Sequence, residues 1–86
     1  MTITIKIQKL FDEITLNIYN IKIVELKNKI KDITGINSTN QLLIYNGIQL
    51  HDNKYIEDYI KPYYKNNNNV YTIQLYVKYS DNRSKL

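Results

Sequence analysis

Apolar and polar residues alternate strictly near both ends of the chain. From Met1 to Gln8, odd positions are apolar and even positions are polar or charged. The same period of two returns from Val70 to Tyr79, with Ile73, Leu75 and Val77 on one side. A period of two is typical of a strand with one buried face, so we predict a strand at each end.

A third alternating stretch follows the first one closely. Ile14, Leu16 and Ile18 alternate with Thr15 and Asn17, after a short connection over residues 9–13. Two strands separated by so short a connection are expected to pair as an antiparallel hairpin.

Between residues 22 and 34 the period changes to that of a helix. Apolar residues recur at spacings of three and four, namely Ile23, Leu26, Ile30 and Ile33. This spacing predicts an amphipathic helix, capped by Asn20 at its start and by Gly35 at its end. Glu25 and Lys29 form an expected i, i+4 pair, and Lys27, Lys29 and Lys31 suit the negative end of the helix dipole.

The segment from Gln41 to Leu50 reads as a second hairpin. Asn46-Gly47 is a strong signal for a two-residue turn between strands. The run before it, Leu42 to Tyr45, is apolar throughout and therefore does not alternate. Beyond it, Tyr55, Ile56 and Tyr59 predict one helical turn that ends before Pro62.

The element order predicts an α+β fold of the β-grasp class. We expect a mixed sheet of four to five strands, with one helix packed on one face and the first and last strands parallel at the centre. A ferredoxin-like plait is the main alternative, but that fold needs two helices. The chain is expected to be one domain over residues 1–79, followed by a flexible polar tail over residues 80–86. A low-complexity loop is expected at residues 65–69.

Composition favours a non-enzyme. Cysteine is absent, His51 is the one histidine, and the carboxylates are scattered along the chain. No residues stand at the spacing of a catalytic or metal site, so we expect an exposed loop histidine, no metal and no cofactor. Asp52 and Asp58 are expected to accept backbone hydrogen bonds in turns. The net charge of +4 is mild, and no apolar run is long enough to cross a membrane.

Several stretches of the chain resemble the ubiquitin family. They are "ITLNI" at 14–18, the helix leading into Gly35-Ile36, "QLLIYNGIQLHD" at 41–52, "YIEDYI" at 55–60 and "TIQLYVKY" at 72–79. The resemblance covers residues 1 to about 79 and implies the β-grasp fold. It also implies one of two roles, a conjugated modifier or a protein-binding module.

Two departures from the family pattern disfavour the modifier. Conjugated members end in Gly-Gly, whereas no glycine follows Gly47 here. The resemblance places Ile48 at the position where ubiquitin has its degradation-linked lysine, so that lysine is missing here. Lys6, Lys27 and Lys29 match other lysine positions of ubiquitin.

The apolar run at 42–45 gains an explanation if the sheet has two surfaces. Strand geometry sends Leu43 and Tyr45 to one face, toward the helix, and Leu42 and Ile44 to the open face. Exposed contiguous apolar surface usually marks a partner site, and the resemblance implies docking at the same face. The predicted partner-binding residues are Leu42, Ile44, Gly47, Ile48, Gln74, Tyr76 and Lys6. Tyr45, Tyr59 and Tyr79 are expected to pack inward.

We therefore predict a non-catalytic module that binds proteins of the ubiquitin and proteasome pathway, with ubiquitin receptors or proteasome-type proteins as partners. The chain is expected to be monomeric, in the cytoplasm or nucleus, and without membrane contact. An RNA-binding ubiquitin-like domain remains an alternative, through Lys78, Arg83 and Lys85. The terminal Ser-Lys-Leu also matches a peroxisomal address, which we consider a weak signal.

Overall fold

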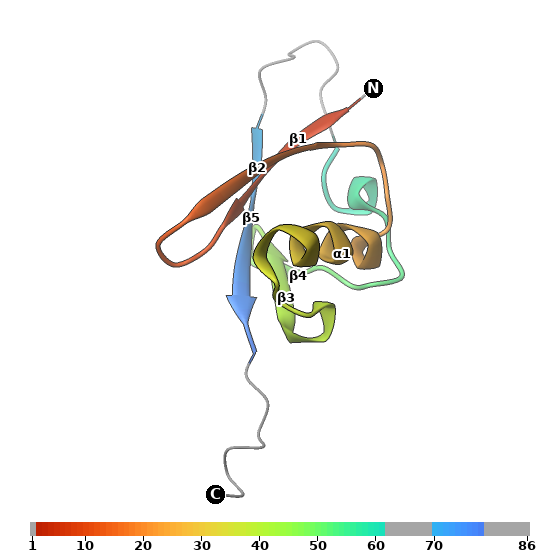
Figure 1. Cartoon of the computed structure of the whole chain (residues 1–86). Coiled ribbons are helices and arrows are strands. Elements are labelled where there is room, and N and C mark those ends of the chain that lie inside the picture. Colours follow the sequence, from red (N-terminus) through yellow and green to blue (C-terminus); the bar gives the residue numbers. More distant parts are fainter. Residues whose placement is uncertain (1, 62–69, 79–86) are drawn as a thin grey trace, which may run out of the picture.

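The computed structural model describes residues 2–61 and 70–78, which form one mixed sheet with a single α-helix (Figure 1). The elements run in the order β1 (Ile3–Gln8), β2 (Glu13–Ile18), α1 (Ile23–Thr34), β3 (Gln41–Tyr45), β4 (Ile48–Gln49) and β5 (Val70–Val77). Two 3-10 helices, Ser38–Asn40 and Ile56–Asp58, lie in the connections. The predicted helical turn before Pro62 is the second of these.

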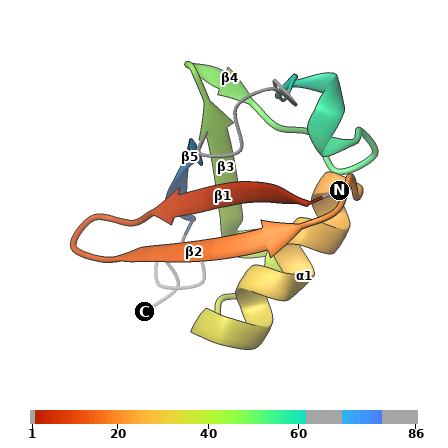
Figure 2. The same ribbon diagram turned by 90° about the horizontal axis from the view of Figure 1, so that it is seen from above.

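The sheet has the strand order β2-β1-β5-β3-β4. β1 and β5 are parallel at its centre, while β2 pairs with β1, and β3 pairs with β4 and β5, in antiparallel fashion. Helix α1 packs against one side of this sheet (Figure 2). This arrangement confirms the predicted β-grasp fold, and the single helix of the described residues excludes the ferredoxin-like plait.

The core lies between α1 and the helix-facing side of the sheet. Odd-numbered residues of β1, β3 and β5 supply the sheet side, as alternation predicts. The buried apolar residues are Ile3, Ile5, Ile7, Ile18, Ile23, Leu26, Ile30, Leu43, Leu50, Ile56, Ile60, Ile73 and Leu75. Tyr45 and Tyr59 pack against this cluster, which confirms their inward assignment.

The start of α1 differs from the prediction. The N-cap is Lys22, whose backbone N–H donates to the Glu25 carboxylate over 3.1 Å. Asn20 lies too early to cap the helix, and its Oδ1 accepts a hydrogen bond from the backbone N–H of Glu57 instead. Glu25 therefore stabilises the helix start, and among the described residues it forms no ion pair with Lys29.

The end of α1 agrees with the prediction except at Ile33. Gly35 adopts φ +79°, and its N–H donates to the carbonyl of Lys31, which closes the helix. Ile36 then packs against the core. Ile33, assigned to the buried stripe from its spacing, lies in the last turn of the helix and is 53% exposed.

A polar arrangement beneath α1 was not predicted. Lys27 is buried, and its Nζ lies 2.7 Å from the carboxylate of Asp52. From the sequence, Lys27 was assigned to the negative end of the helix dipole and Asp52 to a backbone hydrogen bond in a turn. This ion pair replaces both assignments. Gln41 is fully buried, and its Nε2 donates to the carbonyls of Lys27 and Ile36. Asp58 does accept a backbone hydrogen bond, from Tyr55, as expected.

Some sequence predictions lie outside the described residues. They are the loop at 65–69, Pro62, the inward assignment of Tyr79, and the tail at 80–86 with Arg83, Lys85 and the terminal Ser-Lys-Leu.

Candidate protein-interaction surface

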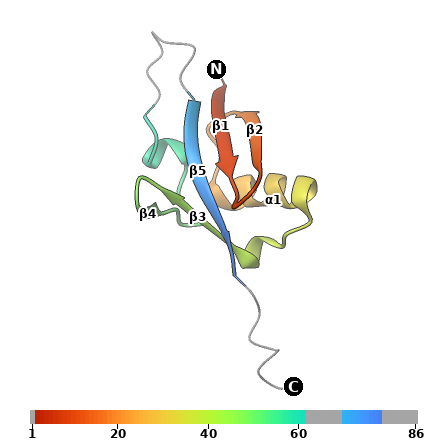
Figure 3. The ribbon, with the colours of Figure 1, turned by 90° about the vertical axis from the view of Figure 1, so that its left-hand side faces the viewer.

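The side of the sheet opposite α1 carries no covering element among the described residues (Figure 3). In this view β5, β1 and β2 face the reader and α1 lies behind them. Residues that project from this side are the even-numbered members of β1, β3 and β5. We call it the outer face.

The register of β3 and β5 brings the predicted residues together. Leu42 lies directly opposite Tyr76, and Ile44 lies directly opposite Gln74. Directly opposed residues of an antiparallel pair share a face, with Cβ atoms about 4.5–5.5 Å apart. The intervening residues, Leu43 and Leu75, are 0% and 5% exposed on the other face.

The exposure of these side chains fits a contact surface. Leu42 and Ile44 are half-buried, Gln74 is exposed, and Tyr76 is 54% exposed. The face therefore presents aliphatic area beside an aromatic ring with a polar end. Aromatic residues of this kind are enriched in protein interfaces.

The turn between β3 and β4 changes one predicted member of the site. Asn46 and Gly47 have φ of +51° and +80°, so the two-residue turn fixes the pairs Tyr45–Ile48 and Ile44–Gln49. Ile48 consequently shares a face with Tyr45, which corrects its placement beside Ile44. Gln49 is the residue that lies across from Ile44.

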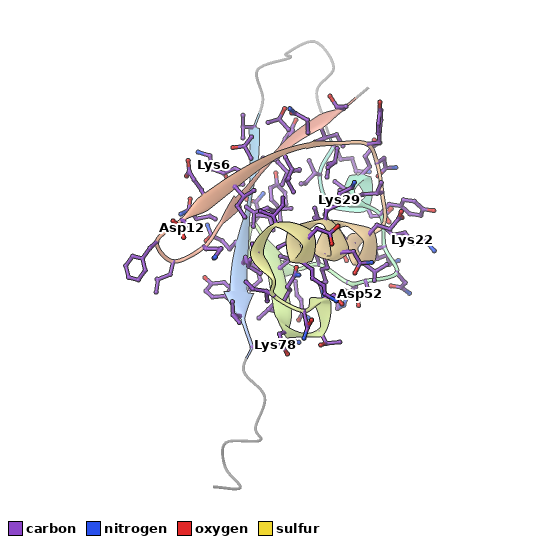
Figure 4. The ribbon with its side chains drawn as sticks, viewed as in Figure 1. Lys6, Asp12, Lys22, Lys29, Asp52 and Lys78 are labelled. Atoms are coloured by element: carbon purple, nitrogen blue, oxygen red, sulfur yellow. The ribbon has the colours of Figure 1, made fainter. Side chains whose placement is uncertain are left out.

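Lys6 lies at a distance from the apolar residues. It is on the outer face, but its partner across the β1–β5 ladder is Thr72, and the residue beside Gln74 is Gln8. Its Nζ lies 3.6 Å from the Glu13 carboxylate, so its charge is partly compensated. Figure 4 shows Lys6 well separated from Lys78. Lys78, at the end of β5, is exposed.

The structure thus defines an outer patch that consists of Leu42, Ile44, Gln49, Gln74 and Tyr76. Gly47 lies at its edge, where an added Cβ would meet no atom within 4 Å. Counting residues across the Asn46-Gly47 turn would have identified Gln49 from the sequence.

A second exposed apolar feature was missed from the sequence. Leu10 and Phe11, in the β1–β2 loop, are 85% and 91% exposed. The loop closes through a 2.7 Å hydrogen bond from the N–H of Lys9 to the carbonyl of Asp12. The sequence signal that could have revealed this feature was a pair of adjacent large apolar residues in a predicted hairpin loop.

His51, the one histidine of the chain, is not a member of the outer patch. His51 is exposed, and its backbone N–H donates to the hydroxyl of Tyr59 over 3.0 Å. Within residues 2–61 and 70–78, no three potential metal ligands gather in one place. No described helix is long and apolar enough to cross a membrane.

Comparison with known proteins agrees with the fold. The model of the Ubiquitin family matches residues 3–65 of the chain. A ubiquitin-like domain from Arabidopsis thaliana, solved by NMR, superposes with a TM-score of 0.77 at 18% identity, over 93% of this chain and 81% of that one. The comparison with curated proteins found no match.

A larger protein contains a similar domain. The crystal structure of ATBAG1 in complex with HSP70 superposes with a TM-score of 0.76 at 18% identity, over 96% of this chain. The chain spans 44% of the ATBAG1 chain. At such identities the structural likeness shows the fold, while the family match covers most of the sequence. The chain belongs to the ubiquitin family.

Proposed function

We propose that this chain is a non-catalytic module that binds proteins of the ubiquitin and proteasome pathway through the outer patch. The observation that carries the proposal is the pairing of Leu42 with Tyr76 and of Ile44 with Gln74 on an uncovered face. Contiguous apolar surface that no element of the chain itself covers usually marks a site where a partner binds.

The dimensions of the patch favour weak and reversible binding. Its five residues are far fewer than the roughly 20–30 residues that each partner contributes to a standard interface. Dissociation constants in the micromolar range are therefore expected. We place such binding in the cytoplasm or the nucleus.

The charges around the patch favour a partner with acidic residues. Lys78 is exposed beyond Tyr76, and Lys9 lies in the adjacent loop. Of the two carboxylates beside that loop, Asp12 and Glu13, the latter is paired with Lys6. Opposite charges at the rim would raise the association rate and orient the partner.

The test is an NMR titration of the ¹⁵N-labelled chain with three kinds of partner. They are isolated ubiquitin-binding helices, proteasome-receptor domains, and HSP70, because HSP70 is the partner in the ATBAG1 structure. Chemical-shift changes are expected at Leu42, Ile44, Gln49 and Tyr76. Their absence with every partner would refute the proposal.

A further inference from the structure

β5 is longer than the strand beside it, and this leaves part of its edge unpaired. The last residue pair of the parallel ladder is Gln8 with Gln74, after which β1 ends. β5 continues to Val77 (Figure 3). From Leu75 to Val77, therefore, β5 has β3 on one side and no described strand on the other.

The backbone of Val77 points toward this unpaired side. The N–H of Lys78 donates to the carbonyl of Asn40 over 2.7 Å. In an antiparallel ladder the hydrogen-bonded pairs alternate, so Tyr76 also bonds to β3 while Val77 directs its N–H and C=O away from it. These two groups are the donor and acceptor that an additional strand would use.

A groove of about 750 Å³ lies along the same edge. Leu10 contributes one wall, and Ile36, Leu75 and Val77 contribute apolar surface from the helix-facing side. Its volume is within the range of about 300–1,000 Å³ that is common for binding pockets. Leu10 is 85% exposed although it lines this groove, so an occupant would remove a large apolar side chain from water.

The charge of the groove narrows the choice of occupant. Lys9 is the one charged residue among the described groove residues, and exposed Lys78 follows directly after Val77. A helix could not satisfy the Val77 backbone, because its own N–H and C=O groups are already paired. An extended segment with apolar side chains at alternate positions and acidic flanks matches both features.

We propose that this groove, the β5 groove, binds an extended apolar segment of a partner protein, flanked by acidic residues, which adds to the free edge of β5 at Val77 as an extra strand. The inference extends the proposed function, because the groove shares Gln74 and Tyr76 with the outer patch. One partner could therefore contact both surfaces.

The probe is a capped peptide of sequence Asp-Glu-Thr-Leu-Thr-Phe-Thr-Glu-Asp, titrated into the ¹⁵N-labelled 86-residue chain. Its Leu and Phe lie on one face of a strand and its Thr residues on the other. We expect saturable shifts of the Val77, Leu75, Leu10 and Ile36 amides. A peptide with Lys in place of every acidic residue is expected to bind at least fivefold more weakly.

Strand addition is separated from side-chain docking by two N-methylated peptides. One carries N-methyl groups at Leu and Phe, and the other carries them at the three Thr residues. Because N–H groups alternate in direction along a strand, one peptide should lose about tenfold or more in affinity while the other keeps most of it. Equal affinities of the two would overturn the strand model.

Two matched variants locate the site. Leu10→Ser should weaken binding at least fivefold, whereas Phe11→Ser, at the neighbouring exposed residue that does not line the groove, should leave it unchanged. Peptide shifts confined to Leu42 and Ile44, or to the free edge of β2, would refute the inference and leave the proposed function standing. Absence of any shift up to 5 mM peptide would refute it as well.

Discussion

Neighbouring residues in β3 have opposite environments, although all of them are apolar. Leu43 is fully buried beneath α1, while Leu42 and Ile44 are half-buried on the outer face. Strand alternation predicted this division correctly from the sequence. It failed for Ile48, because the face of a residue after a two-residue turn depends on the register that the turn imposes. Helical spacing likewise did not reveal that Lys27 is buried, because its ion pair with Asp52 depends on a contact between distant parts of the chain.

The two faces of β3 should respond differently to the same substitution. Leu43→Ala should lower the free energy of unfolding by about 2–4 kcal/mol, since it leaves a cavity in the core. Leu42→Ala should cost less than about 1 kcal/mol, because the side chain keeps part of its contact with water. Urea unfolding measures both. Equal losses would show that the assigned faces of β3 are wrong.

The Lys27 side chain is expected to stabilise the fold more through its stem than through its charge. Asp52 is 59% exposed and can be hydrated without its partner, so Lys27→Met should cost about 1 kcal/mol or less. Lys27→Ala also removes the buried methylenes and should cost about 2 kcal/mol. Thermal or urea unfolding of both variants decides the question; a larger loss for Met than for Ala would contradict this assignment.

At the scale of elements, the sequence predicted every strand and the helix. Period two in β1, β2 and β5 and period 3.6 in α1 are local signals, whereas β3 and β4 were predicted from the turn signal of Asn46-Gly47. The start of the helix was harder to predict from the sequence. Asparagine is a favourable N-cap residue, but the Oδ1 of Asn20 accepts a hydrogen bond from the backbone N–H of Glu57 in a distant loop. The end of the helix could be predicted from the sequence, because glycine favours the positive φ of a C-terminal cap and the Gly35 N–H bonds to the nearby Lys31 carbonyl.

Gly35→Ala should destabilise the protein by about 1 kcal/mol through the backbone alone. A Cβ at this position would meet no atom within 4 Å, so the positive φ accounts for the whole cost. Gly35→Asn should cost less, because asparagine tolerates the left-handed region better than alanine. Denaturant midpoints of the three proteins test the order Gly, Asn, Ala. Alanine as stable as glycine would show that the cap does not need this φ.

At the scale of the whole molecule, the order of elements was sufficient to predict the β-grasp fold and its open face. The outer patch followed from the sheet, because strand order and register place Leu42, Ile44 and Tyr76 together. The β5 groove could not be predicted from the sequence, since it depends on β1 ending before β5 and on the position of the loop that carries Leu10. Domains with the ubiquitin-like fold are generally non-catalytic.

The proposal that partners bind the outer patch is tested most directly by two matched isoleucine substitutions. The ¹⁵N-labelled chain, Ile44→Ala and Ile33→Ala are each titrated with the ubiquitin-binding helices and proteasome-receptor domains, after their spectra confirm folding. Ile33 is exposed on α1, on the other side of the sheet, and serves as the control. We predict at least tenfold weaker binding for Ile44→Ala and unchanged binding for Ile33→Ala. Equal affinities of the two variants, or a loss confined to Ile33→Ala, would contradict the proposal.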